Sequence, residues 1–213
     1  MYNVFMPRAA LSLDQIAEFR SQICASATRL FAENGYDGVT LRALASSLGC
    51  SPMTPYRYFA NKAEIFDTVR RAAAERLADC LDRAVVGHRE HSDRLRALCH
   101  AYVEFAVAEP HAYRIMFELD RSARPESLHG DDLRPWFVMH AAVTEAVRDG
   151  ALDGEPNTVA HLLWSGVHGI VALHLSGMLA LGLDLAALVE AFIERELGPA
   201  AVPTRPSRAS DSP

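Results

Sequence analysis

The chain has 213 residues, half of them hydrophobic, and a formal net charge of −6 at pH 7. This length suits one small and one medium domain, and the composition supplies a sizeable core. The net negative charge of the whole chain argues against a polyanionic partner such as DNA. The charge is unevenly distributed, however: residues 1–75 carry 8 basic and 7 acidic side chains, whereas the remainder carries 13 basic and 20 acidic ones.

The first helix is predicted to start at Ser12. Ser12 and Gln15 match a capping box, and apolar residues from Ile16 to Phe31 recur at steps of three or four, which gives the helix one apolar face. Gly35 is expected to end it. Residues 1–11 are predicted to be flexible, and they lack the basic segment and long apolar run of a secretion signal.

The next segment predicts two short helices joined by a tight turn. Thr40 is expected to cap the first helix, and Gly49 lies where a left-handed C-terminal cap is needed. The apolar positions of the first helix recur at helical spacing: Leu41, Leu44, Ala45 and Leu48. Ser51 can cap the second helix, which is expected to run from Pro52 to about Tyr58. Helices this short need a third helix beneath them, which is the arrangement of a DNA-binding helix-turn-helix.

The second short helix concentrates side chains suited to a DNA groove. They can touch thymine methyls, hydrogen-bond to base edges and contact phosphates. They are Met53, Thr54, Tyr56, Arg57 and Tyr58. The alternative is a turn between core helices in which the aromatic residues are simply buried. Phe59 is expected to be buried, and Pro55 is tolerated because a short helix can begin with a 3₁₀-like turn.

Lys62 is the chain's only lysine, and its position is unusual. Asn61 and Glu64 match a capping box for the next helix, which places Lys62 at the first helical position. A cation is unfavourable there by about 0.3–1 kcal/mol. A bound phosphate would reverse that sign, since helix N-termini attract anions. The alternative is a solvated surface lysine. A nearly neutral head can bind DNA if its basic groups share one face.

Several short motifs between residues 14 and 66 follow a known pattern. They are Glu33-Asn34-Gly35-Tyr36, Val39-Thr40-Leu41, Ala45, Leu48-Gly49-Cys50-Ser51, Tyr56-Arg57-Tyr58-Phe59-Ala60-Asn61-Lys62 and Ile65-Phe66. Together they resemble the TetR family of bacterial transcription regulators, from which the chain departs at Pro55. The resemblance implies a cytoplasmic homodimer bound to a palindromic operator in double-stranded DNA. We expect Thr40, Arg42 and Ser51 to belong to the same DNA-binding surface.

The rest of the chain predicts further helices and no strand. A long helix from Asn61 to about Val86 is expected to join the head to the body. The later helices are expected at Asp93 to Ala108, from Pro110, from Asp131-Asp132 to Arg148, from Thr158 to Leu181 and from Asp184 to Leu197. Ser122 to Gly130 and Asp149 to Asn157 are expected to be loops. Residues 198–213 are rich in Pro, Ala, Ser and Arg and are predicted to be disordered.

The apolar stretch from Leu162 to Leu183 approaches the length of a membrane span. Its histidines and small residues favour a helix buried on all sides instead, with no membrane partner. Small residues that would let helices approach closely occur at Gly166, Gly169, Ser176 and Gly177. The run from Trp164 to Gly169 resembles the W…HG signature of one subgroup of TetR C-terminal domains.

That resemblance implies a small-molecule pocket in the body and a homodimer formed through the last two helices. The expected ligand-binding residues are apolar and aromatic, with two histidines as polar members. They are Tyr102, Phe105, Tyr113, Met116, Phe117, Trp136, Phe137, His140, Trp164 and His168. The alternative for any one of them is a plain core position.

Other chemistry has little support in the sequence. The cysteines, Cys24, Cys50, Cys80 and Cys99, show no C-x-x-C spacing and suit a reduced, cytosolic protein. No histidine pair has the i, i+4 spacing of a helical zinc site, so no metal is expected. Motifs for phosphate loops, dinucleotides and nucleophilic serines are missing, so neither catalytic residues nor a cofactor is expected.

The prediction is an all-α protein with an N-terminal three-helix helix-turn-helix head, joined by a long helix to a C-terminal ligand-binding and dimerisation bundle. The head is expected at 12–75, with its helix-turn-helix at about 40–59, and the body at 76–197. The predicted function is a transcription regulator, most simply a repressor released by a small apolar or amphipathic ligand. The alternative is a helical protein–protein assembly module whose head no longer binds DNA.

Overall fold

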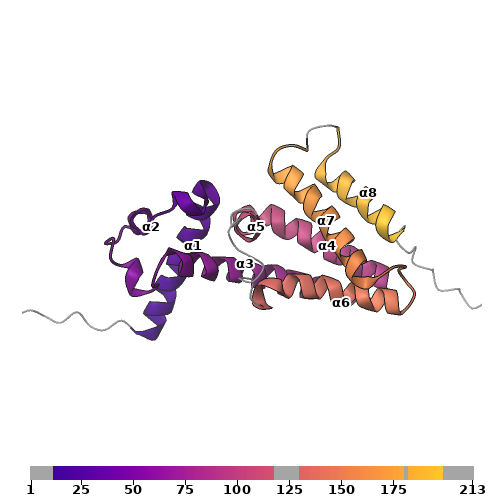
Figure 1. Cartoon of the computed structure of the whole chain (residues 1–213), viewed down its shortest axis with the longest axis horizontal. Coiled ribbons are helices and arrows are strands. Elements are labelled where there is room, and N and C mark those ends of the chain that lie inside the picture. Colours follow the sequence, from indigo (N-terminus) through magenta and orange to yellow (C-terminus); the bar gives the residue numbers. More distant parts are fainter. Residues whose placement is uncertain (1–11, 118–129, 180–181, 199–213) are drawn as a thin grey trace, which may run out of the picture. The chain divides into compact units, whose positions relative to one another are not determined.

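The computed structural model describes residues 12–117, 130–179 and 182–198, and the regular structure in those ranges is helical (Figure 1). The elements are α1 (Leu13–Gly38), α2 (Leu41–Ser47), the 3₁₀ turn η1 (Pro55–Arg57), α3 (Lys62–Ala84), α4 (His91–Ala108), α5 (Pro110–Phe117), the 3₁₀ turn η3 (Gly130–Leu133), α6 (Arg134–Arg148), α7 (Pro156–Leu175) and α8 (Leu185–Leu197). The predicted all-α class is confirmed. Residues 1–11, most of the loop expected at 122–130, and the tail after Gly198 lie outside the described ranges.

The described chain forms two compact units. The first contains residues 12–76, 109–117 and 130–134, and the second contains 77–108 together with 135–179 and 182–198. The division after Arg76 lies beside the expected boundary at residue 75. The residues of α5 were predicted to belong to the body, but in the structure α5 packs against α1. Ile115 of α5 is fully buried in the core of the first unit.

The core of the first unit is built on the apolar face of α1. Ser12 and Gln15 form the predicted capping box, and Gly35 interrupts the helix with a φ of 73°. The buried residues come from all the elements of the unit: Ile23, Ala27, Phe31, Val39, Leu41, Leu44, Phe59, Ile65, Phe66, Val69 and Ile115. The ring of Phe66 lies edge-on to Phe31 and to Tyr36 at 5.1 and 5.0 Å. This core supports the short elements above it.

The turn after α2 follows the prediction, but the second short helix does not. Thr40 caps α2 by accepting a hydrogen bond from the Ala43 N–H at 3.1 Å, and Gly49 has a φ of 63°. The helix expected from Pro52 to Tyr58 is wrong, since η1 covers only Pro55–Arg57. Proline has no N–H, so residue 55 cannot donate to the Ser51 carbonyl. That carbonyl accepts from Thr54 at 2.8 Å instead.

The start of α3 is capped much as predicted. The Asn61 side chain accepts from the Glu64 N–H at 2.9 Å, but the Glu64 carboxylate returns to the N–H of Ala60, one residue earlier than a capping box requires. Further along α3, the buried Arg70 pairs with Asp132 at 3.3 Å. Arg76 pairs with Glu109 at 2.8 Å, which joins α3 to the residue before α5 within the first unit.

The second unit packs α4 against α7 and α8, and α7 against α8. Gly166 makes the α7–α8 contact possible, because a Cβ atom there would lie 2.2 Å from the ring of Phe192. Two polar contacts join the start of α4 to the end of α6: Arg94 to Glu145 at 2.6 Å and His91 to Asp149 at 3.1 Å.

Two helix boundaries in this region differ from the prediction. The residues expected to open a helix at Asp131-Asp132 form η3, and α6 begins at Arg134. α7 ends at Leu175 rather than Leu181, because Gly177 takes a φ of 72°. The Met178 N–H then donates back to the Leu173 carbonyl at 2.9 Å, in the manner of a glycine C-terminal cap.

The prediction that the stretch around α7 is buried on all sides is also wrong for the single chain. Leu162 and Leu173 are 60% and 47% exposed. Among the described residues, α7 is the one helix whose length and composition alone would allow it to cross a membrane, and 28% of its most apolar window is buried. The core helix of a soluble protein passes the same test, so this composition does not indicate a membrane.

Candidate functional site

Residues 50–61, here called the recognition segment, form an exposed surface on the first unit. Met53 and Tyr56 are 67% and 51% exposed, and Arg57 is exposed as well. Pro55 and Phe59 are buried. The alternative in which Tyr56 is a core residue is therefore wrong. The segment offers apolar, hydroxyl and cationic groups to a partner on one side while two buried residues fix it to the core.

The recognition segment is attached to α1 by Arg20. One guanidinium nitrogen of Arg20 donates a hydrogen bond to the Tyr58 carbonyl, and the guanidinium carbon lies 4.1 Å from the centre of the Phe59 ring. Phe19 packs on Tyr58 with ring centroids 5.0 Å apart. Arg20 was not among the predicted site residues. The sequence feature that could have identified it is a basic residue beside Phe19 at the edge of the apolar face of α1.

Lys62 is attached to the end of α1 in the same way. Its ammonium group donates to the Tyr36 carbonyl at 2.9 Å and lies 4.2 Å from the centre of the Tyr36 ring. These contacts offset the unfavourable position of a cation at a helix N-terminus. The alternative, in which Lys62 is a surface lysine that contacts only solvent, is therefore wrong. An ammonium has three N–H donors, so the bond to Tyr36 leaves room for a further acceptor.

The remaining expected DNA-binding residues lie around the same surface. Thr40 and Arg42 are exposed at the start of α2, although the Thr40 hydroxyl oxygen already caps that helix. Ser51 is exposed and its hydroxyl oxygen accepts from the Met53 N–H at 3.4 Å. Thr54 and Tyr58 are half-buried. The positive charges of this surface therefore come from the exposed Arg42 and Arg57 and from the half-buried Lys62.

A second candidate site lies in the second unit, where aromatic and imidazole rings of three helices meet. We call it the aromatic cluster. It consists of Tyr102 on α4, Trp136 and His140 on α6, and His161, Trp164 and His168 on α7. The three α7 residues fall at i, i+3 and i+7, which places them on one face of the helix. His161 was not among the predicted ligand-binding residues, although this spacing could have identified it.

The rings of the aromatic cluster are in contact with one another. Trp136 has ring-centroid distances of 4.2 Å to His161 and 5.7 Å to Trp164, and Trp164 lies 5.9 Å from His168. The Tyr102 hydroxyl is 2.9 Å from Nδ1 of His168. His161 Nδ1 is 2.7 Å from the Asn157 carbonyl, so this nitrogen must carry the proton. Both tryptophans and His168 are half-buried, so part of the cluster is exposed to solvent.

The other expected ligand-binding residues divide between the two units. Phe105 is buried on α4, and Phe137 is 55% exposed on α6. Tyr113, Met116 and Phe117 lie on α5, in the first unit, where Tyr113 is fully buried against the ring of Phe117 at 5.0 Å. The structure therefore brings five expected residues together in the aromatic cluster: Tyr102, Trp136, His140, Trp164 and His168.

In the described residues, potential metal ligands do not cluster, and burial suppresses the ionisation of two cysteine thiols. No three of their His, Cys, Asp or Glu side chains gather around a common point. Burial raises the pKa of the Cys99 thiol to about 12 and also raises that of Cys24. A thiol with a raised pKa stays protonated at neutral pH and is a poor nucleophile.

Two family models match this chain. Residues 23–69 match the family model described as bacterial regulatory proteins, tetR family, and residues 95–195 match the model described as tetracyclin repressor-like, C-terminal domain. A protein of unknown function from Rhodococcus sp. RHA1 has a solved structure that is 26% identical, with a TM-score of 0.72 over 90% of this chain and 97% of that one.

Two characterised relatives match shorter stretches. The transcriptional activator FasR of Mycolicibacterium smegmatis is 27% identical over 109 residues, which are 51% of this chain and 50% of FasR. The transcriptional repressor Rv1474c of Mycobacterium tuberculosis is 37% identical over 78 residues, 37% of this chain and 41% of the repressor. The chain thus spans half or less of the length of these two relatives.

Proposed function

We propose that this chain, which belongs to the TetR family of bacterial transcription regulators, represses transcription. In this proposal it binds a palindromic operator through the recognition segment. The chain is a DNA-binding regulator, and the relatives include both an activator and a repressor. The observation that carries the proposal is the exposed side of the recognition segment, where Met53 and Tyr56 project while Pro55 and Phe59 are buried.

The proposed contacts follow from the chemistry of each exposed group. Met53, Thr54 and Tyr56 contact base edges in the major groove, where methyl and hydrogen-bonding groups distinguish the base pairs. The phosphate contacts are assigned to exposed or partly free polar groups: Thr40, Arg42, Ser51, Arg57, Tyr58 and Lys62. These contacts fix the position of the head on DNA and make binding depend on salt.

A homodimer formed through α7 and α8 is the assembly that we propose. Leu162, Ser165, Gly169 and Leu173 follow one another at steps of three or four and form a stripe on α7. The two leucines are exposed, and nothing lies within 4 Å of the Cβ position of Gly169. An exposed apolar stripe with small residues suits a close helix contact with a second copy. Two heads in such a dimer would contact the half-sites of a palindrome.

The effector that we propose is a small apolar or amphipathic molecule held at the aromatic cluster. Stacked rings offer apolar area, and the Tyr102–His168 pair offers a hydrogen-bonding group in a half-buried setting. Members of this family are generally regulators rather than enzymes, and we propose a cytoplasmic, non-catalytic protein that needs no cofactor. The alternative of an assembly module with an inactive head is disfavoured by the exposed recognition segment.

The DNA-binding proposal is tested by selecting bound sequences from the DNA upstream of the gene and measuring affinity against salt. Lys62→Ala should weaken all sequences to a similar degree and reduce the slope of log affinity against log salt by about one. Tyr56→Ala should change which sequences are preferred.

Arg29→Ala is the matched control, because Arg29 is exposed on α1 and pairs with Glu33 away from the recognition segment. If Lys62→Ala left affinity and salt slope at the Arg29→Ala values, the phosphate contact would be wrong. If Tyr56→Ala kept the parent's sequence preference, the base contact would be wrong.

The effector proposal is tested by tryptophan fluorescence, because both tryptophans of the chain belong to the aromatic cluster. A compound that binds there should change the emission and lower operator affinity. Operator DNA should weaken compound binding by the same factor, since coupling between two sites is reciprocal. A hundredfold factor corresponds to about 2.7 kcal/mol. Equal compound affinities with and without operator would contradict the release mechanism.

A further inference from the structure

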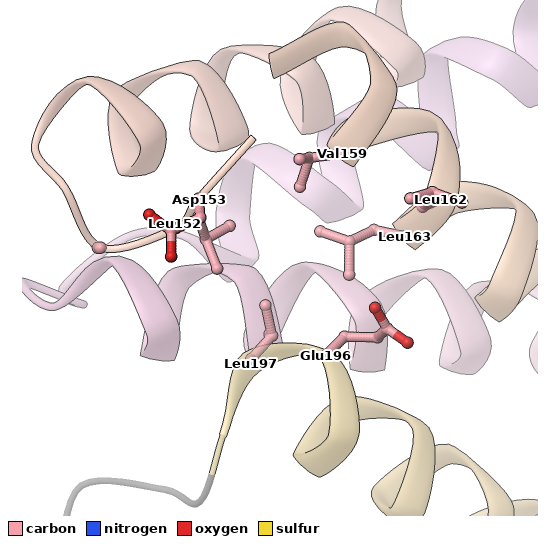
Figure 2. Close-up of a pocket in the computed structure, with 8 residues that line it drawn as sticks. Leu152, Asp153, Val159, Leu162, Leu163, Glu196 and Leu197 are labelled. Atoms are coloured by element: carbon pink, nitrogen blue, oxygen red, sulfur yellow. The ribbon is translucent and has the colours of Figure 1, made fainter. Parts of the chain in front are cut away.

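A separate pocket of about 440 Å³ lies at the end of the second unit where α6 leads into α7 and α8 ends (Figure 2). Its apolar lining residues are Leu152 from the α6–α7 connection, Val159 and Leu163 from α7, and Leu197 from α8. The volume falls in the range of small-molecule sites. None of these residues belongs to the aromatic cluster.

The polar groups of this pocket are acidic. Asp153 and Glu196 line it, and Figure 2 shows their carboxylates on different sides of the leucine side chains. The structure gives Asp153 no ion-pair partner in the described ranges. Glu196 is ion-paired with its neighbour Arg195, whose guanidinium nitrogens lie 2.8 and 2.5 Å from one carboxylate oxygen of Glu196. The charge of Glu196 is therefore largely balanced, and a cation would depend on Asp153.

The helix ends around the pocket add to the same preference. α8 terminates beside it at Leu197, and the carbonyl end of a helix attracts cations. The opposing end is the N-terminus of α7, but the Glu155 carboxylate already accepts from the N–H groups of Asn157 and Thr158 at 2.9 and 2.7 Å. Asp153 and the C-terminus of α8 therefore favour a positive ligand.

We propose that this pocket binds a small organic cation with an aliphatic body, such as an alkylammonium ion. The aliphatic part lies on Leu152, Leu163 and Leu197, and the ammonium group lies against the Asp153 carboxylate. Contact with the leucine side chains supplies part of the affinity, and the Asp153 carboxylate selects the charge. This site is independent of the proposed effector at the aromatic cluster.

The two sites occupy opposite sides of α7. Val159 and Leu163 are one helical turn apart on the side toward α8, whereas His161, Trp164 and His168 follow the other side. Leu162 also lines the pocket and belongs to the stripe proposed as the dimer contact, whereas Val159 and Leu163 do not belong to that stripe. A ligand in the pocket would therefore leave the tryptophans without direct contact.

The test is a calorimetric titration of the full-length protein with octyltrimethylammonium below its micelle concentration. Octanoate and octyl glucoside serve as the anionic and neutral probes of equal chain length. We expect the cation to bind, the neutral probe to bind more weakly and the anion not to bind. Asp153→Asn should weaken cation binding by about fivefold, the size expected for one exposed charge pair.

Two further variants make the result decisive. Val159→Phe should fill the pocket and abolish binding of the cation, with circular dichroism used to check the fold. Glu194→Gln is the matched control for the loss of a carboxylate, because it removes an exposed carboxylate of α8 that does not line the pocket, and it should leave affinity unchanged. Equal affinity for cation and anion, or an unchanged affinity in Asp153→Asn, would overturn the proposal. A change in tryptophan emission that persists in Asp153→Asn would place the ligand at the aromatic cluster and also overturn it.

Discussion

The recognition segment and α7 are held in place by opposite means. The recognition segment has one three-residue 3₁₀ turn of its own, and side chains of other elements fix it, with Arg20 bound to the Tyr58 carbonyl and Lys62 to that of Tyr36. α7 closes its own backbone hydrogen bonds over 20 residues, and Gly166 fixes its distance from α8. The position of the short surface segment thus depends on a few polar contacts, whereas the position of the long helix depends on close packing against its neighbour.

The largest effect should come from Gly166→Leu in α7. Its Cβ would lie 2.2 Å from the buried ring of Phe192, so α7 and α8 would have to separate. Overpacking of this kind costs about 1–3 kcal/mol or somewhat more. Urea unfolding should therefore show a lower midpoint.

Gly169→Ala is the matched control for Gly166→Leu. Nothing lies within 4 Å of its Cβ position, and alanine favours a helix over glycine by about 0.5–1 kcal/mol, so the single chain should become slightly more stable. A Gly166→Leu protein as stable as the parent would show that α7 is not fixed by packing against Phe192. In a dimer formed through the stripe, Gly169→Ala should also weaken self-association.

The second effect should come from Arg20→Met in the first unit. The substitution removes the hydrogen bond to the Tyr58 carbonyl and the cation above Phe59 while keeping apolar volume. A hydrogen bond from a charged group contributes about 1.5–3 kcal/mol, and less at this half-buried position. We expect weaker operator binding with an unchanged salt slope, since Arg20 positions the segment and is not proposed to contact phosphate.

Arg29→Met, on the exposed side of the same helix, should show little change in either measurement. If Arg20→Met behaved like Arg29→Met in operator titrations and urea unfolding, the recognition segment would not depend on its contact with α1. If it reduced the salt slope, Arg20 would be a phosphate contact rather than a positioning residue.

The smallest effect concerns the cap of α7 and is measured as a dependence of stability on acidic pH. The hydrogen bond from the Thr158 side chain, followed by the amides of Asn157 and Thr158, holds the pKa of Glu155 below its ordinary value of 4.5. A lowered folded-state pKa means that the stabilisation is complete above the unfolded value and is lost as the pH falls through the folded value. Thermal unfolding between pH 6 and about pH 3 should show a shallower loss in Glu155→Gln than in the parent.

Glu104→Gln, which removes an exposed carboxylate from α4, is the control for the pH experiment. Its pH profile should match that of the parent. If Glu155→Gln also matched the parent, the carboxylate would not contribute to the N-terminus of α7.

Local signals were sufficient for the helical class and for most helix ends. Ser12 with Gln15 and Thr40 act as the predicted caps, and Asp184, predicted only to begin the last helix, also acts as a cap. Such signals are local, because a cap bonds to an amide two or three residues away. Gly35 and Gly49 take the backbone angles that only glycine adopts readily. The motifs of the recognition segment likewise identified the family, since they lie within a short stretch of chain.

Contacts between distant residues decided the rest. The sequence alone did not show that Arg20 and Lys62 bind backbone carbonyls 38 and 26 residues away, or that α5 packs against α1. It also did not show that α7 has one exposed side, one side packed on α8 and one side carrying the aromatic cluster. A helical pattern states which residues share a face, but only the tertiary structure supplies the partner that each face meets, because burial and hydrogen bonding are properties of both surfaces together.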